Sequence, residues 1–155
     1  NKAIDYILNI IPGRNELERQ KISKLILENG DLISNYIFAL RYNINVLEHG
    51  QVIIDSKDPE YNYKFASEVP GANIEAHAKM VLESKNLMYN YLFAKNVKRA
   101  NIENHREVIL EAQKRNFINE HDKDFIDMFL EEFPQNSNCW EVNNVKKMIK
   151  EHKSN

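Results

Sequence analysis

The amino-acid sequence predicts an all-α protein, an α-solenoid with a right-handed superhelix of about five two-helix repeats, each of roughly 28 residues. The stretch "YNYKFASEVPGANIEAH", which begins at Tyr61, is nearly repeated as "YNYLFAKNVKRANIENH", which begins at Tyr89. Within both stretches the apolar residues recur at helical spacing. No segment shows the alternation and turn chemistry of a β-hairpin. A duplicated structural unit explains this sequence better than a duplicated catalytic motif.

The repeat extends beyond these two stretches. An ungapped alignment of residues 57–84 with residues 85–112 gives 14 identical positions among 28. Weaker copies precede and follow them, and they diverge most at the ends, where a terminal repeat must meet water on one side. The prediction is a single helical-repeat domain over residues 1–155, with units at residues 1–29, 30–56, 57–84, 85–112 and 113–155.

The first helix of the third unit has clear start and stop signals. Asp58 is placed to cap it, and Pro59 suits the first helical position. An apolar stripe follows at a spacing of four residues, formed by Tyr61, Phe65 and Val69. In the fifth unit Phe125, Phe129 and Phe133 take the corresponding positions.

The second helix of the third unit begins after a turn at Pro70-Gly71, with Asn73 as its cap. Its apolar face comprises Ile74, Ala78, Val81 and Leu82. The fourth unit has Lys98-Arg99 in place of Pro-Gly, which predicts that the turn does not need a positive φ there. Two such short helices cannot bury their stripes alone, so successive pairs are expected to stack.

This two-helix unit, with its column of small and apolar residues, resembles the α-solenoid class that includes HEAT and armadillo repeats, although each unit is shorter. The motif Y-x-F-A…A-N-I is also similar to degenerate helical repeats in uncharacterised bacterial, phage and large-virus proteins. The resemblance implies an architecture and a tendency to bind partners. It carries over no catalytic residue.

Composition narrows the functional classes. The 21 basic and 23 acidic residues give a formal net charge of -2, which argues against a dedicated polyanion binder. The single cysteine, Cys139, excludes an internal disulfide framework and is compatible with a cytoplasmic location. No apolar run approaches the roughly 18 to 20 residues of a membrane span, so no membrane association is expected.

His49, His77 and His105 recur at intervals of 28 residues and suggest a metal site. Equivalent residues on successive helix pairs should lie roughly 8–10 Å apart. Zinc needs donor atoms at about 2.0–2.1 Å, so the three cannot share one ion. We expect each histidine to form a hydrogen bond with a neighbouring turn, and we expect no metal or other cofactor.

Asparagines form two further columns. Asn73 and Asn101 are expected to cap second helices. Asn62 and Asn90 fall on the inward side of first helices, where they would bond the backbone of the adjacent repeat. The alternative is a row that grips an extended peptide, as armadillo-type surfaces do.

Aromatic and basic residues near the third and fourth units are the candidate partner-binding groups: Tyr63, Tyr91, Lys64, Lys95 and Arg99. The two tyrosines lie two residues past the core tyrosines and so point off the apolar stripe. Exposed tyrosines suit a protein interface, and burial between repeats is the structural alternative.

A basic patch over residues 95–115 would support nucleic-acid binding instead. It contains Lys95, Lys98, Arg99, Arg106, Lys114 and Arg115. Glutamates are interleaved with these residues, which favours an ordinary solvated face.

The fifth unit offers the enzymatic alternative. "EHDKD" around His121 contains acid–base groups, but no second histidine or cysteine with ligand spacing lies near it, and Asp122 is expected to cap the next helix. No base is apparent for Cys139, and Trp140 is expected to cover the end of the stack. The sequence therefore favours a non-catalytic protein–protein interaction module, acting as a scaffold or a host-directed inhibitor.

Overall fold

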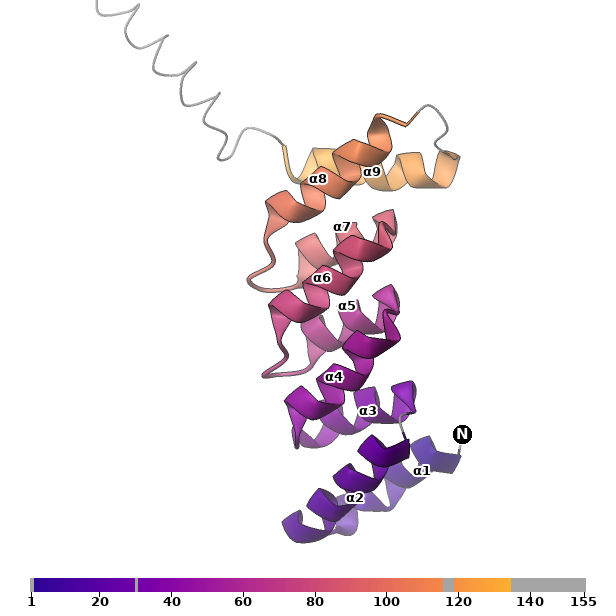
Figure 1. Cartoon of the computed structure of the whole chain (residues 1–155), viewed down its shortest axis with the longest axis vertical. Coiled ribbons are helices and arrows are strands. Elements are labelled where there is room, and N and C mark those ends of the chain that lie inside the picture. Colours follow the sequence, from indigo (N-terminus) through magenta and orange to yellow (C-terminus); the bar gives the residue numbers. More distant parts are fainter. Residues whose placement is uncertain (1, 30, 116–118, 135–155) are drawn as a thin grey trace, which may run out of the picture. The chain divides into compact units, whose positions relative to one another are not determined.

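Helices are the only regular secondary structure in the part of the chain that the structure describes. The computed structural model describes residues 2–29, 31–115 and 119–134, and none of these residues lies in a strand. The predicted all-α class is therefore confirmed (Figure 1). The chain divides into two compact parts, Asn1–Val108 and Ile109–Asn155. The single domain predicted over residues 1–155 stays a prediction.

The helices alternate with short turns at close to the predicted spacing. The described elements are α1 (Lys2–Asn9), η1 (Ile11–Gly13), α2 (Glu16–Asn29), α3 (Leu32–Tyr42), α4 (Val46–Ser56), α5 (Pro59–Glu68), α6 (Ile74–Ser84), α7 (Leu87–Asn96), α8 (Ile102–Gln113) and α9 (Glu120–Glu132).

Two kinds of contact join the helices of the first part. The helices of a unit contact each other, α3 with α4 and α5 with α6. Equivalent helices of successive units also contact each other, α3 with α5, α5 with α7, and α4 with α6. Each unit is thus supported by its neighbours as well as by its own turn.

The core clusters combine residues of consecutive units. In one cluster, Ala39 and Ile53 of one unit pack with Phe65 and Val69 of the next. The following cluster repeats this arrangement with Ala66, Val81, Phe93 and Val97. Phe65 and Phe93 are fully buried, and burying such a side chain stabilises by about 1.5–3 kcal/mol. This core belongs to the boundary between units, because one helix pair could not form it alone.

The predicted caps of the third and fourth units are present. Asp58 Oδ1 accepts from the amide of Tyr61 at 3.0 Å, and Asn73 Oδ1 accepts from the amide of Ala76 at 3.2 Å. In the fourth unit Asn101 Oδ1 accepts from the amide of Glu103 at 3.1 Å. Each cap satisfies one amide that the first helical turn leaves unpaired.

The prediction for the turn of the fourth unit is wrong. Arg99 has φ 73°, close to the φ 86° of Gly71 at the equivalent position of the third unit. Both turns therefore need a left-handed residue, and arginine adopts that conformation only at a cost of about 1 kcal/mol or more. The sequence did not reveal this, because arginine is an unusual choice where the backbone favours glycine.

In the second part, the expectation that Asp122 caps α9 is also wrong. Asn119 is the cap, and its Oδ1 accepts from the amide of Asp122 at 2.8 Å. Of the three phenylalanines expected on this helix, Phe129 is fully buried and Phe125 and Phe133 are half-buried.

Reciprocal substitutions test the turn. Arg99→Gly should raise the free energy of unfolding by about 1 kcal/mol, because glycine adopts positive φ without the steric cost. Gly71→Ala should lower it by about 1 kcal/mol. An added Cβ at Gly71 meets only Val46 Cγ1, at 3.9 Å, which is ordinary van der Waals contact. The change in stability therefore reports the backbone conformation and not a steric clash. Urea unfolding followed by circular dichroism measures both, and destabilisation by Arg99→Gly would contradict the assignment.

Candidate functional site

Each of the second, third and fourth units buries an asparagine, a histidine and a phenylalanine together, here called the Asn–His–Phe cluster. The members are Asn35, His49 and Phe38; Asn62, His77 and Phe65; and Asn90, His105 and Phe93. Relative exposure is 0% for all nine side chains. The histidine column of the sequence is thus an internal feature of the framework.

The third unit shows how the cluster is bonded. His77 Nδ1 lies 2.8 Å from Asn62 Oδ1. The imidazole also lies against the Phe65 ring, with ring centroids 4.9 Å apart. The histidine was expected to bond a neighbouring turn, whereas its partner is a side chain on the other helix of its own unit.

The asparagine also reaches the preceding unit, as the sequence predicted. Asn62 Nδ2 donates to the carbonyl of Ile53, at the end of α4, at 3.0 Å, and to the carbonyl of Asp58 at 2.8 Å. Asn90 donates in the same way to Val81 at 3.1 Å and to Asn86 at 2.8 Å. One side chain therefore joins its own helix, the preceding unit and the histidine of its own unit.

These bonds determine the histidine tautomer. The asparagine NH₂ group is used by two carbonyls, so its oxygen faces the imidazole and must accept. The proton therefore lies on Nδ1 in each cluster, and Nε2 carries a lone pair.

The clusters differ at Nε2. In the second unit the Ser23 hydroxyl lies 2.8 Å from His49 Nε2, and Asn45 Nδ2 donates to the Ser23 oxygen at 2.9 Å. His77 Nε2 has no hydrogen-bond partner among the described residues. Gly50 lies above it, where an added Cβ would come 3.4 Å from Nε2 and 3.1 Å from Phe65 Cε1. A serine at this position would have to displace the Phe65 ring by a few tenths of an ångström.

Burial keeps the three imidazoles neutral. It lowers the pKa of His49, His77 and His105 from 6.5 to about 4, and at His49 the nearby Glu48 carboxylate partly opposes this effect. Neutral, fully buried rings cannot exchange protons with a substrate. No group of three or more metal-ligating side chains occurs in the described residues either.

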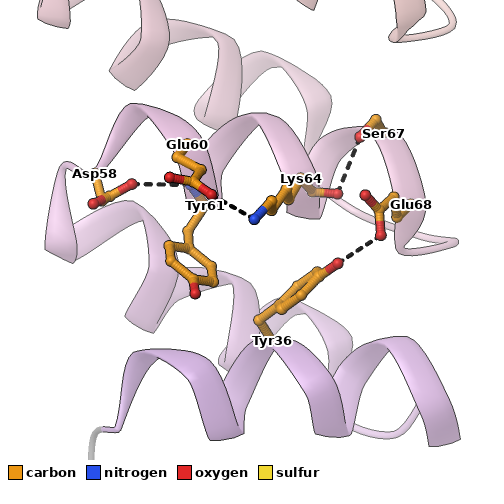
Figure 2. Close-up of polar contacts among 7 residues, drawn as sticks. All are labelled: Tyr36, Asp58, Glu60, Tyr61, Lys64, Ser67 and Glu68. Carbon is orange, nitrogen blue, oxygen red and sulfur yellow. Dashed lines mark hydrogen bonds and ion pairs between the residues drawn. The ribbon is translucent and has the colours of Figure 1, made fainter. Parts of the chain in front are cut away.

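A second network covers the exposed side of the first helices. Tyr36 on α3 donates to Glu68 Oε2 on α5 at 2.5 Å, and Lys64 pairs with Glu60 at 2.5 Å (Figure 2). The Lys64 ammonium also lies 5.1 Å from the centroid of the Tyr61 ring. Polar groups on this surface are therefore largely engaged with one another.

Four of the five predicted partner-binding residues belong to such internal contacts. Tyr63 is half-buried and accepts from Asn96 Nδ2 at 2.9 Å. Tyr91 is only 4% exposed, and Lys95 Nζ donates to its hydroxyl at 2.9 Å. Lys64 is paired with Glu60. Their assignment to an interface stays a prediction, and the structure gives each of them a role within the framework.

The fifth residue, Arg99, is exposed and lies between two surface hollows of the first part. The hollow between α6 and the start of α8, called the helix hollow, has a volume of about 420 Å³. The hollow between the α5–α6 and α7–α8 turns, called the turn hollow, has a volume of about 410 Å³. Ile74 and Arg99 line both, so the two hollows adjoin at these side chains.

The remaining sequence candidates do not form a site within the described residues. Arg106 from the basic patch is 6% exposed and pairs with Glu103 at 3.1 Å. His121 is exposed and packs edge-on against Phe125, with ring centroids 5.4 Å apart. Cys139 and Trp140 lie outside the described residues.

Comparison with known proteins gives no family for the chain: no protein-family model, curated protein or solved structure matches it. The described helices include none with the length and apolarity required to cross a membrane.

Removing one cluster asparagine should be costly. Asn62→Ala should lower the free energy of unfolding by about 2–4 kcal/mol, because it leaves the buried His77 Nδ1–H without an acceptor and opens a small cavity. The control is Asn73→Ala, which removes an exposed cap and should cost about 1 kcal/mol. If urea unfolding gives the same loss of unfolding free energy for both variants, the cluster stabilises the protein no more than an exposed cap does.

Acid should destabilise the protein through the histidines. Because their folded pKa lies below the unfolded value, their contribution is complete above pH 6.5 and is lost as the pH falls toward 4. Three such groups together should lower the free energy of unfolding by on the order of 5 kcal/mol between pH 7 and pH 5.

Urea titrations across this pH range measure the slope. His77→Phe should reduce the histidine-dependent slope by about a third, whatever it does to stability at pH 7. Asn73→Ala, which removes no titratable group, is the control and should leave the slope unchanged. An unaltered slope in His77→Phe would contradict the neutral assignment.

Proposed function

We propose that the chain is a small α-solenoid, a right-handed superhelix of two-helix units, and that it acts as a non-catalytic protein–protein interaction module. A scaffold or a host-directed inhibitor would each be a form of this function. The observation that carries the proposal is the threefold recurrence of the Asn–His–Phe cluster with the same bonds.

The cluster supports the proposal in two ways. Each asparagine bonds the preceding unit, which is what a chain of mutually supporting repeats requires. The clusters also bury the three histidines and engage them in hydrogen bonds. Without these contacts, the histidines would be the best acid–base candidates in the described residues. The groups left for function are therefore on the surface, where open hollows adjoin an arginine.

Nucleic-acid binding through residues 95–115 has less support. Two of its cations are engaged within the protein, Arg106 with Glu103 and Lys95 with the Tyr91 hydroxyl. A phosphate backbone would also meet the carboxylates among these residues.

Affinity capture tests the function. The immobilised full chain should retain at least one protein from a host lysate by 10-fold or more over blank resin. That protein, purified, should bind in a defined stoichiometry by calorimetry. Capture is repeated after nuclease treatment, which removes proteins bridged by nucleic acid. Retention that vanishes with nuclease, or no retained protein, would overturn the proposal.

A further inference from the structure

The helix hollow and the turn hollow together make a continuous groove across the third and fourth units. One wall is α6 with the turn before it, and the other is the α7–α8 turn with the start of α8. Each hollow alone has the volume of a small ligand pocket, and the two adjoin at Ile74 and Arg99. An extended segment can span both hollows, whereas a compact small molecule would fill only one.

The lining of this groove is mixed, with apolar and polar side chains in both hollows. Ala78, Leu82 and Ala100 line the helix hollow, and Val69, Pro70 and Ala72 line the turn hollow. Ile74 is common to both. An occupant would therefore gain most by placing apolar side chains on both sides of Arg99.

Charged groups of both signs line the groove, namely Lys79, Lys98, Arg99, Glu68 and Glu75, and among them only Arg99 lines both hollows. Lys98 and Arg99 have no ion-pair or hydrogen-bond partner among the described residues, and both line the turn hollow. The carboxylates are placed differently: Glu68 accepts from the Tyr36 hydroxyl, and Glu75 lies in the first turn of α6. An arginine beside apolar side chains is suited to a carboxylate, which it can hold with two parallel hydrogen bonds.

Arg99 adopts a positive φ outside a helix C-cap, whereas Lys57 and Lys85 adopt one as the C-caps of α4 and α6. The φ of 73° at Arg99 carries a steric cost that Gly71 avoids at the equivalent position. The arginine makes no described contact that would offset this cost within the protein. Strained residues of this kind occur at sites of function more often than elsewhere.

We propose that this groove binds an extended segment of a partner protein in which one aspartate or glutamate lies between apolar side chains. The carboxylate bonds the Arg99 guanidinium, and the flanking apolar side chains enter the two hollows. Glu68 and Glu75, on the same groove, disfavour a densely charged ligand such as a polyphosphate chain. The inference rests on the proposed function and specifies the chemistry of its partner.

Selection from a phage-displayed library of random dodecapeptides tests the inference with the full chain. We expect enriched peptides to carry an acidic residue flanked by apolar ones. A synthetic peptide from this set should bind at least 10-fold more weakly when its acidic residue is changed to the amide, and also when the protein carries Arg99→Asn.

The variants are matched to the geometry. Asparagine tolerates positive φ and already adopts it at Asn43 and Asn45, so Arg99→Asn should remain folded. Arg99→Gly, expected to be more stable than the native chain, should lose binding equally and so separates binding from stability. Lys24→Gln, an exposed change of the same charge on α2, should bind like the native chain.

The outcomes separate this inference from the function on which it rests. Enriched peptides without an acidic residue, or equal binding by Arg99→Asn, would overturn the carboxylate assignment and leave the interaction module standing. If the capture experiment retains a protein but the library yields no enriched peptide, the partner does not bind as an extended segment, and only that part of the inference is overturned. Binding of single-stranded DNA at the groove instead of peptide would overturn both.

Discussion

The second, third and fourth units each depend on how one buried asparagine side chain is satisfied. Its three hydrogen-bonding groups go to its own helix, to the preceding unit and to a histidine on the paired helix. A buried polar group left without a partner costs about 1–3 kcal/mol, so these bonds can form together only when consecutive units are in register. Apolar packing of Phe65 or Phe93 favours contact between units, whereas the asparagine specifies which contact. The repeated letters of the sequence are those that this geometry requires.

The clusters also explain where the repeat weakens. In the second unit three residues, 43–45, join the two helices, whereas five residues, 69–73, join them in the third. Two asparagines with positive φ, Asn43 and Asn45, replace the single glycine. Asn45 then has no cap hydrogen bond and donates instead to Ser23, which completes the bonding of His49. In the third unit, Gly50 of the preceding unit lies above His77, and Nε2 has no partner among the described residues. The glycine allows α4 to approach the Phe65 ring closely, but it offers no hydroxyl to Nε2.

Much of this could be predicted from sequence, because helix spacing, caps and repeat columns are local signals. The helices, the caps at Asp58, Asn73 and Asn101, and the asparagine bonds to the adjacent backbone were all accessible in this way. The pairing of His77 with Asn62 was not, since a column of identical letters does not say which two columns meet across a helix pair. The left-handed conformation of Arg99 was missed for a different reason. Only the glycine at the equivalent position, Gly71, indicates that this turn needs a positive φ, and arginine gives no such indication. The cap at Asn119 was missed because Asp122 is an equally good capping residue by type.

The division between repeated and unrepeated positions indicates where specificity can reside. The repeated column of Asn62 and Asn90 joins units, so a change there is expected to cost stability. Positions that differ between the third and fourth units are free of this constraint, and they include Pro70-Gly71 against Lys98-Arg99. A partner of the kind proposed above would gain selectivity by contacting unrepeated residues. Arg99 is one of these, and it stands where the third unit has a glycine with the same backbone conformation. The proposed carboxylate contact gives a reason for an arginine at this position that the packing of the helices does not.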